Sequence, residues 1–127
     1  MRIGVFTPLL SSLPLKDVFK KLAGLNIRTV ELGTGNYPGD PHCKLSMLDS
    51  VTELREFKKH LSDEGFSISA LSCHGNPLHP DPQQAKHDSE VNRQTILLAE
   101  KLGVPVVVDG GLGLGLGHRA SCRRSGG

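Results

Sequence analysis

The feature that most constrains the fold is a repeated order of helix pattern, glycine and apolar strand. Gly65 precedes the segment Phe66 to Ser72, and Gly103 precedes Val104 to Val108. Each glycine follows a helix-type pattern, as expected where a helix ends in a left-handed residue. Strands that alternate with helices in this way must be parallel and joined by right-handed crossovers. The sequence therefore predicts an α/β architecture, either an open doubly wound sheet or part of a (β/α)8 barrel.

The periodicity predicts four strands, at 3–6, 27–32, 66–72 and 104–108. Three helices are expected between them. Ser11 and Ser12 can cap the first helix, with Pro14 in its first turn and Gly24 as its stop. The second runs from about Leu48 and the third from about Gln84. The side chains expected on their buried faces are Leu15, Val18, Phe19 and Leu22, then Val51, Leu54, Phe57 and Leu61, then Val91, Thr95, Leu98 and Leu102.

Charge and composition exclude several classes of protein. Residues 1–108 hold twelve Lys or Arg and twelve Asp or Glu, so the net charge of +2 comes from the last stretch. A neutral body gives no support for nucleic-acid binding through a basic face. No window is apolar enough to span a bilayer, the first residues form no signal sequence, and three cysteines form no disulfide framework. We therefore expect a cytoplasmic location, with no nucleic-acid partner and no membrane partner.

Polar side chains follow two of the predicted strands, at the ends where parallel α/β folds place their sites. His74, Asn76 and His79 come directly after the third strand, in a loop stiffened by proline. Glu31 ends the second strand between two apolar residues, and either a basic neighbour or a functional contact would satisfy its charge. His42 lies in the following loop, and for both His42 and His79 a solvated histidine is an equal alternative. For His74 a structural histidine is the lesser alternative. These five residues are the candidate substrate-binding set.

Geometry argues against a zinc site made of His42, Cys43, Cys73 and His74. Adjacent residues of an extended segment point to opposite faces, so each pair can supply one ligand, and the spacing matches no compact zinc motif. We expect Cys43 and Cys73 to be small buried side chains instead. The sequence also lacks a phosphate-binding glycine loop of either common type.

Two segments carry a resemblance to a known family. The segments are Thr-Val-Glu-Leu-Gly-Thr-Gly-Asn-Tyr-Pro-Gly-Asp at 29–40 and Ser-Cys-His-Gly-Asn-Pro-Leu-His-Pro at 72–80. They resemble the second and third strand ends of the sugar phosphate isomerase/epimerase family, within the xylose isomerase-like TIM barrels. The resemblance covers residues 1–108 and implies the first four strands and three helices of an incomplete (β/α)8 barrel.

The resemblance also implies a chemistry. Such a barrel moves a proton next to the carbonyl of a sugar or polyol, which needs a base and a cation or hydrogen-bond donor for the developing oxyanion. The implied cofactor is a divalent metal, Mn, Mg or Zn, and His74 would line the substrate pocket. In that family the metal ligands stand on later strands, which this sequence does not contain. No catalytic residue and no metal ligand is therefore predicted here, and we expect this chain alone to be inactive.

After Val108 the composition changes, and seven of the last eighteen residues are glycine. We expect residues 109–127 to be a Gly-rich, Arg-containing tail that is either disordered or translated out of frame from a truncated barrel. Two function classes stay open. One is the isomerase or epimerase lineage, with DNA repair on a related barrel as a lesser variant. The other is a non-catalytic half-barrel that binds a small ligand or self-associates through its open edge.

Overall fold

A computed structural model describes residues 2–110, so the expectations for the tail from residue 111 onward lie outside the described residues. One sheet of four parallel strands runs in the order β1-β2-β3-β4. The strands are β1 (Gly4–Phe6), β2 (Thr29–Gly33), β3 (Ser67–Ser72) and β4 (Val107–Val108), and the helices are α1 (Leu15–Gly24), α2 (Val51–Glu64) and α3 (Pro82–Leu102). The predicted α/β class with four parallel strands and three helices is confirmed.

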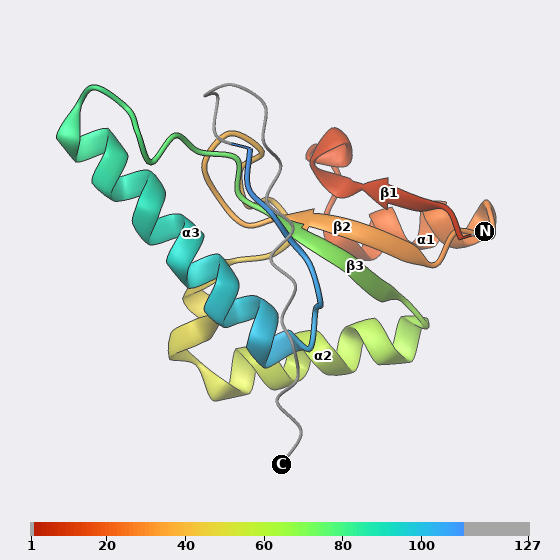
Figure 1. Cartoon of the computed structure of the whole chain (residues 1–127). Helices are drawn as coiled ribbons and strands as arrows, with labels where there is room; N and C mark the ends of the chain where they lie inside the picture. Colours follow the sequence, from red (N-terminus) through yellow and green to blue (C-terminus); the bar gives the residue numbers. More distant parts are fainter. Residues whose placement is uncertain (1, 111–127) are drawn as a thin grey trace, which may run out of the picture.

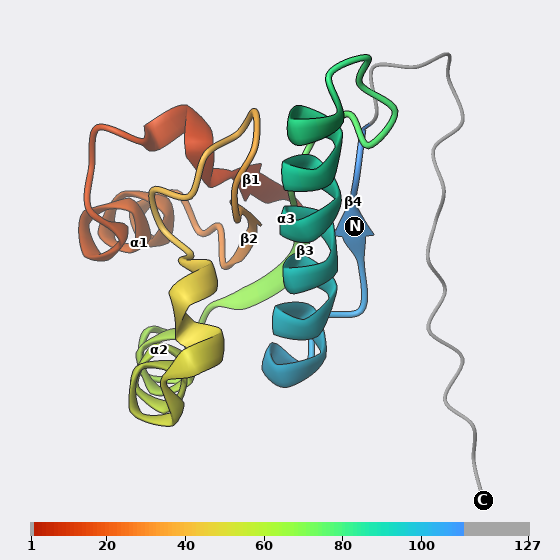
Figure 2. The same cartoon turned by 90° about the vertical axis from the view of Figure 1, so that its left-hand side faces the viewer.

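The three helices lie on one side of the sheet, and the described residues leave the other side open (Figures 1 and 2). The core forms where the helices meet the sheet. It contains Val30 and Leu32 of β2, Leu71 of β3, Phe19 of α1 and Leu98 of α3, each 0% exposed. The Phe19 and Phe66 rings stack with their centroids 4.2 Å apart. This one-sided burial is the layer arrangement of a barrel wall, in which helices cover the outer face.

The start of α1 differs from the prediction. A short 3-10 helix, η1 (Thr7–Leu10), follows β1, and the N–H of Ser11 donates to the carbonyl of Pro8 at its end. The N-cap of α1 is Pro14, which makes no side-chain capping bond. The prediction that Ser11 and Ser12 cap α1 is therefore wrong, because this extra turn separates them from the helix. Gly24 is the last residue of α1 rather than a residue beyond it.

The start of α2 also differs. A second 3-10 helix, η2 (Leu45–Asp49), contains Leu48, and α2 begins at Val51 with Ser50 as its cap. The hydroxyl of Ser50 accepts from the N–H of Glu53 at 3.2 Å. Val51 is 83% exposed, so the prediction that it is buried is wrong. As the first helical residue it points away from the sheet, whereas Leu61 is buried at the other end of α2.

The remaining boundaries move by a few residues. Asp81 caps α3 and Pro82 opens it, two residues before the predicted start at Gln84. β4 begins only at Val107, because the N–H of Val104 donates to the carbonyl of Ala99 and holds that segment against the end of α3. β2 begins at Thr29 rather than at residue 27. The predicted stops at Gly65 and Gly103 are confirmed, with φ of 71° and 73°.

A β-bulge in β3 decides which side chains face the helices. The register pairs Val30 with Ile68 but Glu31 with Ala70, so Ser69 is the extra residue. A strand without a bulge would put Ile68 and Leu71 on opposite faces, because they are three positions apart. The bulge restores both to the core side. It consequently places Ser72, and His74 beyond it, on the open side of the sheet.

Candidate functional site

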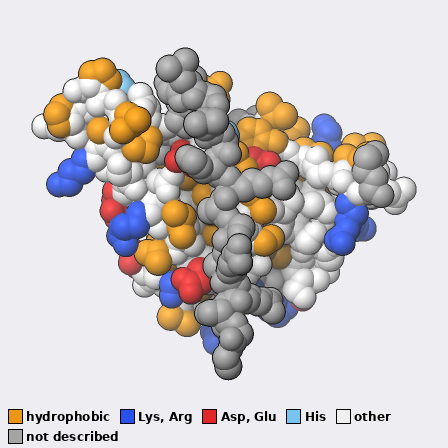
Figure 3. Space-filling view, in the orientation of Figure 1, with side chains coloured by type: hydrophobic (Ala, Val, Ile, Leu, Met, Phe, Trp, Pro, Cys, Tyr) orange, Lys and Arg blue, Asp and Glu red, His pale blue; other side chains and the backbone are white. Residues whose placement is uncertain are grey.

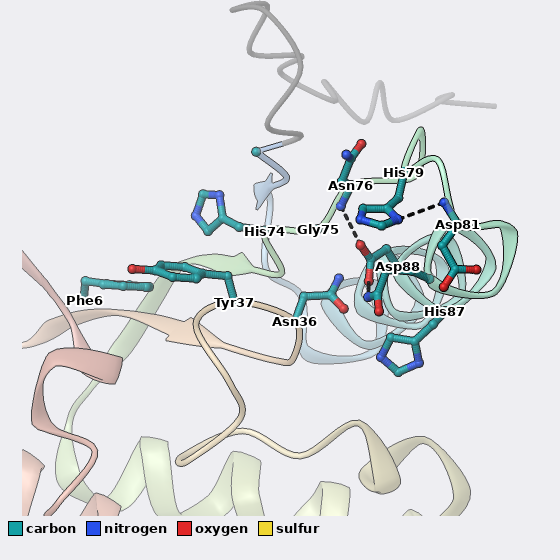
Figure 4. A pocket seen from close by; sticks show the side chains of 12 residues that line it. Phe6, Asn36, Tyr37, His74, Gly75, Asn76, His79, Asp81, His87 and Asp88 are labelled. Carbon is teal, nitrogen blue, oxygen red and sulfur yellow. Dashed lines mark hydrogen bonds between the residues drawn. The ribbon is translucent and has the colours of Figure 1, made fainter.

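A cavity of about 950 Å³ lies at the carboxyl ends of the strands (Figure 4). The end of β1, the loops after β2 and β3, the first turns of α3 and the residue after Asp109 all contribute to it. Its lining residues are Phe6, Asn36, Tyr37, His74, Gly75, Asn76, His79, Asp81, Gln84, His87, Asp88 and Gly110. Figure 4 shows the rings of Phe6, Tyr37 and His74 at one end and the side chains of His79, Asp81 and Asp88 at the other.

The loops after β2 and β3 are tied together beneath this cavity. The N–H of Tyr37 donates to the carbonyl of His74 at 3.0 Å, and Nδ2 of Asn36 donates to the carbonyl of Cys73 at 3.1 Å. Asn36 has a φ of 54°, a left-handed conformation that asparagine tolerates better than most residues. These bonds set His74 and Tyr37 against each other at the cavity wall.

Gly75 allows α3 to approach the loop after β3. A Cβ on Gly75 would overlap Nδ2 of Asn36 and would lie 2.9 Å from the Cβ of Asp88. Real Cβ atoms do not come this close to other heavy atoms, so a side chain would push the loop away from the helix. Glycine at position 75 therefore allows the loop after β3 to pack closely against α3 and Asn36.

The carboxylate of Asp88 holds the loop after β3 against α3. Asp88 is 5% exposed, its Oδ2 accepts from the N–H of Asn76 and its Oδ1 accepts from Nε2 of Gln84, both at 2.7 Å. The hydrogen bond from the Asn76 backbone is the main cause that lowers the pKa of Asp88 below its ordinary value of 3.8. Burial opposes this shift, while Gln84 and the nearby His87 and His79 add to it. Asp88 is therefore a carboxylate at neutral pH.

Turn bonds order the rest of the loop. Oδ1 of Asn76 accepts from the N–H of Leu78 at 3.1 Å, and Nδ1 of His79 accepts from the N–H of Asp81 at 3.1 Å. The Asp81 carboxylate accepts in turn from the N–H of Gln83 at 2.9 Å and caps α3. Because Nδ1 of His79 is an acceptor, the neutral ring carries its proton on Nε2. The amide group of Asn76 and Nε2 of His79 are then donors available to a ligand.

The structure brings three of the five candidate residues together. His74, Asn76 and His79 line the large cavity. Glu31 lies on the open face of the sheet and lines a neighbouring cavity with Arg2, Gly4, Phe6, Thr29 and Ser69; Phe6 lines both.

His42 is placed apart from the other candidates. It is 6% exposed, bonds through Nε2 to the carbonyl of Leu13 at 2.8 Å, and lines a separate hollow beside α2.

Cys43 and Cys73 are 1% and 0% exposed, which confirms that they are buried side chains. Burial raises the pKa of Cys43 to about 12, with a contribution from Asp40. Burial likewise raises the pKa of Cys73 to about 11, although a hydrogen bond with Thr95 acts in the opposite direction. Neither thiol has the lowered pKa of a reactive nucleophile.

Among residues 2–110, no group of three or more His, Cys, Asp or Glu side chains is arranged to hold a metal ion. The described residues therefore do not fit the divalent metal that the resemblance implies, and we derive no chemical step through it. The same part of the chain contains no helix long and apolar enough to cross a membrane.

Sequence reasoning missed several residues of the cavity, of which Tyr37 and Asp88 are the most informative. Tyr37 is the only tyrosine of the chain and is 91% exposed in a turn-rich loop. Asp88 precedes the buried Val91 and Thr95 by three and seven positions, so it belongs to the same buried helix face. The sequence did contain a signal for Asp88, because a charged residue at the spacing of a buried helix face needs a polar partner.

Comparisons with known proteins extend this description. No protein-family model matches the chain. The uncharacterized protein YfiH of Bacillus subtilis (strain 168) is 34% identical over 109 residues, which are 85% of this chain and 34% of that protein. The chain thus spans about a third of the length of this curated relative.

Two solved structures share the fold. D-psicose 3-epimerase, crystallised in the presence of D-fructose, superimposes with a TM-score of 0.56 at 15% identity, over 86% of this chain and 37% of that one. Protein SMc04130 from Sinorhizobium meliloti 1021 gives a TM-score of 0.53 at 16% identity, over 87% and 37%. At this identity the likeness concerns the fold alone, and it shows that the four parallel strands and three helices have the arrangement of part of a TIM barrel.

Proposed function

We propose that this chain forms part of the substrate-binding wall of a sugar isomerase or epimerase. The observation that carries the proposal is the convergence of His74, Asn76 and His79 with Tyr37 on one cavity at the carboxyl ends of parallel strands. That is the end at which barrels bind their substrates. The shared fold with D-psicose 3-epimerase and the resemblance of the two strand-end segments support the same lineage.

The residue types suit a sugar or polyol. Tyr37 and Phe6 offer apolar ring surface for the carbon skeleton, and the donors of Asn76 and His79 suit hydroxyl oxygens. Glu31 would reach a bound sugar from the adjoining cavity, which shares Phe6 with the first. We assign His42 a structural role, since it bonds to the Leu13 carbonyl. Proton transfer next to a carbonyl would be completed by residues and a metal outside the described part of the chain.

The proposal is tested by titrating the 127-residue chain with D-fructose and following its backbone amide signals by NMR. We expect shifts at Tyr37, Gly75 and Asn76, and weaker binding in a His74→Ala variant. His60→Gln is the matched control, because His60 lies on α2 and lines the separate hollow near His42. Absence of shifts at the cavity, or equal weakening by both variants, would contradict the proposal.

A second candidate is self-association through the open edges of the sheet. Within the described residues β1 and β4 are the edges of the sheet and each pairs on one side only. Val106 before β4 is 41% exposed, and the face seen in Figure 3 carries several apolar patches among its polar side chains. Unpaired strand edges with apolar side chains favour pairing with another chain.

Two copies could place β1 of each beside β4 of the other. Light scattering of the purified chain would then give twice its mass of 13.7 kDa. A Val106→Lys variant should shift the dimer toward the monomer. A monomer at all concentrations would contradict this candidate and leave the binding proposal in place.

A further inference from the structure

The cavity carries two carboxylates and three histidines, His74, His79 and His87, but no permanently charged basic side chain among its described lining residues. Asp81 and Asp88 line it, and none of its described lining residues is Lys or Arg. Phosphate recognition relies on Arg, Lys, a metal ion or a set of unpaired backbone N–H groups. A phosphate dianion placed here would face the carboxylates of Asp81 and Asp88, and the histidines are the only described lining side chains that could carry a positive charge.

The N-terminus of α3 opens onto the same cavity, and a helix N-terminus attracts anions. Asp81 already occupies this position, because its carboxylate accepts from the N–H of Gln83. Pro82 has no N–H to offer, and the N–H of Ala85 donates to the carbonyl of Asp81. A carboxylate of the chain itself thus already lies at this helix terminus, where a bound anion would have to compete with it.

Backbone N–H groups of the surrounding loops are also engaged. The N–H of Asn76 donates to Asp88, and that of Leu78 donates to the Asn76 side chain. The N–H of Tyr37 donates to the carbonyl of His74, and the N–H of His79 donates to the carbonyl of Asn76. The N–H of Asp81 donates to Nδ1 of His79. These five donors do not point together at an empty site, as they would in an anion-binding loop.

From these observations we infer that this cavity selects a neutral polyhydroxy ligand and discriminates against its phosphorylated form. The inference rests on the proposed function and narrows its substrate class. Hydroxyl groups both donate and accept, so they match carboxylate and amide oxygens as well as the donors of Asn76 and His79. The apolar rings of Phe6 and Tyr37 would meet the uncharged carbon face of such a ligand.

The test compares D-fructose, D-fructose 6-phosphate and inorganic phosphate as ligands of the full chain, by amide shifts at about pH 8, where an ordinary histidine is neutral. We expect D-fructose to shift the signals of Tyr37, Gly75 and Asn76, and its phosphate ester to bind at least about tenfold more weakly. Inorganic phosphate should neither bind nor compete. Tighter binding of the ester, with competition by phosphate, would overturn the inference and leave the proposed function standing. Binding of neither sugar would overturn both.

A pair of variants checks the cause of the discrimination. Asp81→Asn keeps a capping side chain at α3 but removes one negative charge from the cavity. The dissociation constant of D-fructose 6-phosphate divided by that of D-fructose should fall by about threefold or more, because a full negative charge near the ligand is removed. Asp63→Asn is the control, because Asp63 pairs with Lys59 on exposed α2, away from the cavity. Equal ratios in wild type and Asp81→Asn would overturn the electrostatic explanation.

Discussion

The backbone N–H of Asn76 donates to Oδ2 of Asp88 over 2.7 Å, which joins the loop after β3 to the first turns of α3. The two residues are twelve positions apart in the chain, and Pro77 and Pro80 lie between them. A loop without regular secondary structure is thereby held in one position. The donors that we assign to ligand binding depend on this bond for their placement.

Replacement of Asp88 by Asn should lower the stability of the protein. An asparagine side chain has one oxygen, so its NH2 group would face the N–H of Asn76 or the amide of Gln84. We expect the midpoint of urea unfolding to fall on the order of 0.5 M. Asp63→Asn is the control, since the Lys59–Asp63 pair is exposed and should leave the midpoint unchanged.

The loss of stability in the Asp88→Asn variant should depend on pH. The pKa of Asp88 is lowered below 3.8, chiefly by the hydrogen bond from Asn76. A carboxyl group with a lowered folded-state pKa stabilises the folded state above its unfolded-state pKa and loses this contribution as the pH falls through the folded-state value. The difference between wild type and Asp88→Asn should therefore be full at neutral pH and shrink below about pH 4. A constant difference down to the lowest pH would contradict an ionised Asp88.

Two glycine replacements should have opposite effects. Alanine at Gly75 would crowd Asn36 and Asp88, and we expect a loss of about 1–3 kcal/mol in the free energy of unfolding. Alanine at Gly24 has no atom within 4 Å and lies in α1, so it should add about 0.5–1 kcal/mol. Chemical denaturation of both variants measures this contrast. A stable Gly75→Ala variant would show that α3 can move away from the loop.

Cys43 and Cys73 should resist alkylation in the folded protein. Their pKa values, raised to about 12 and about 11 from 9.0, leave little of the reactive thiolate near pH 8. Burial also blocks the reagent. Site-resolved mass spectrometry should show labelling at least about a hundredfold slower than for the same cysteines in urea. Rapid labelling of either residue under native conditions would contradict the packing described here.

The exposure of Val51 can be tested by comparing its replacement with that of the buried Leu61 on the same helix. Leu61→Ala removes a side chain that is 8% exposed and should cost about 2–5 kcal/mol of unfolding free energy. Val51→Ala changes a side chain that is 83% exposed and should stay within about 0.5 kcal/mol of wild type. Similar losses of unfolding free energy in both variants would support the sequence-based expectation that Val51 and Leu61 are buried on the same face of α2.

Local signals in the sequence were enough to specify the class of the fold. Gly65 and Gly103 end helices because a left-handed residue is a local steric requirement, and the apolar periods of helix and strand are local as well. Together they specify parallel strands joined by helices. The polar residues His74, Asn76 and His79 follow a strand in the sequence, so their place at the carboxyl end of the sheet was also predictable.

Which side chains share a site depends on how distant segments of the chain pack together. The bulge at Ser69 exists because both Ile68 and Leu71 must reach the helix side, a demand that depends on what packs there. Asp88 enters the cavity because α3 folds back along the loop after β3, which Gly75 permits. His42 is held apart by the carbonyl of Leu13. Register and helix approach depend on contacts between segments distant in the chain, and no local pattern encodes them.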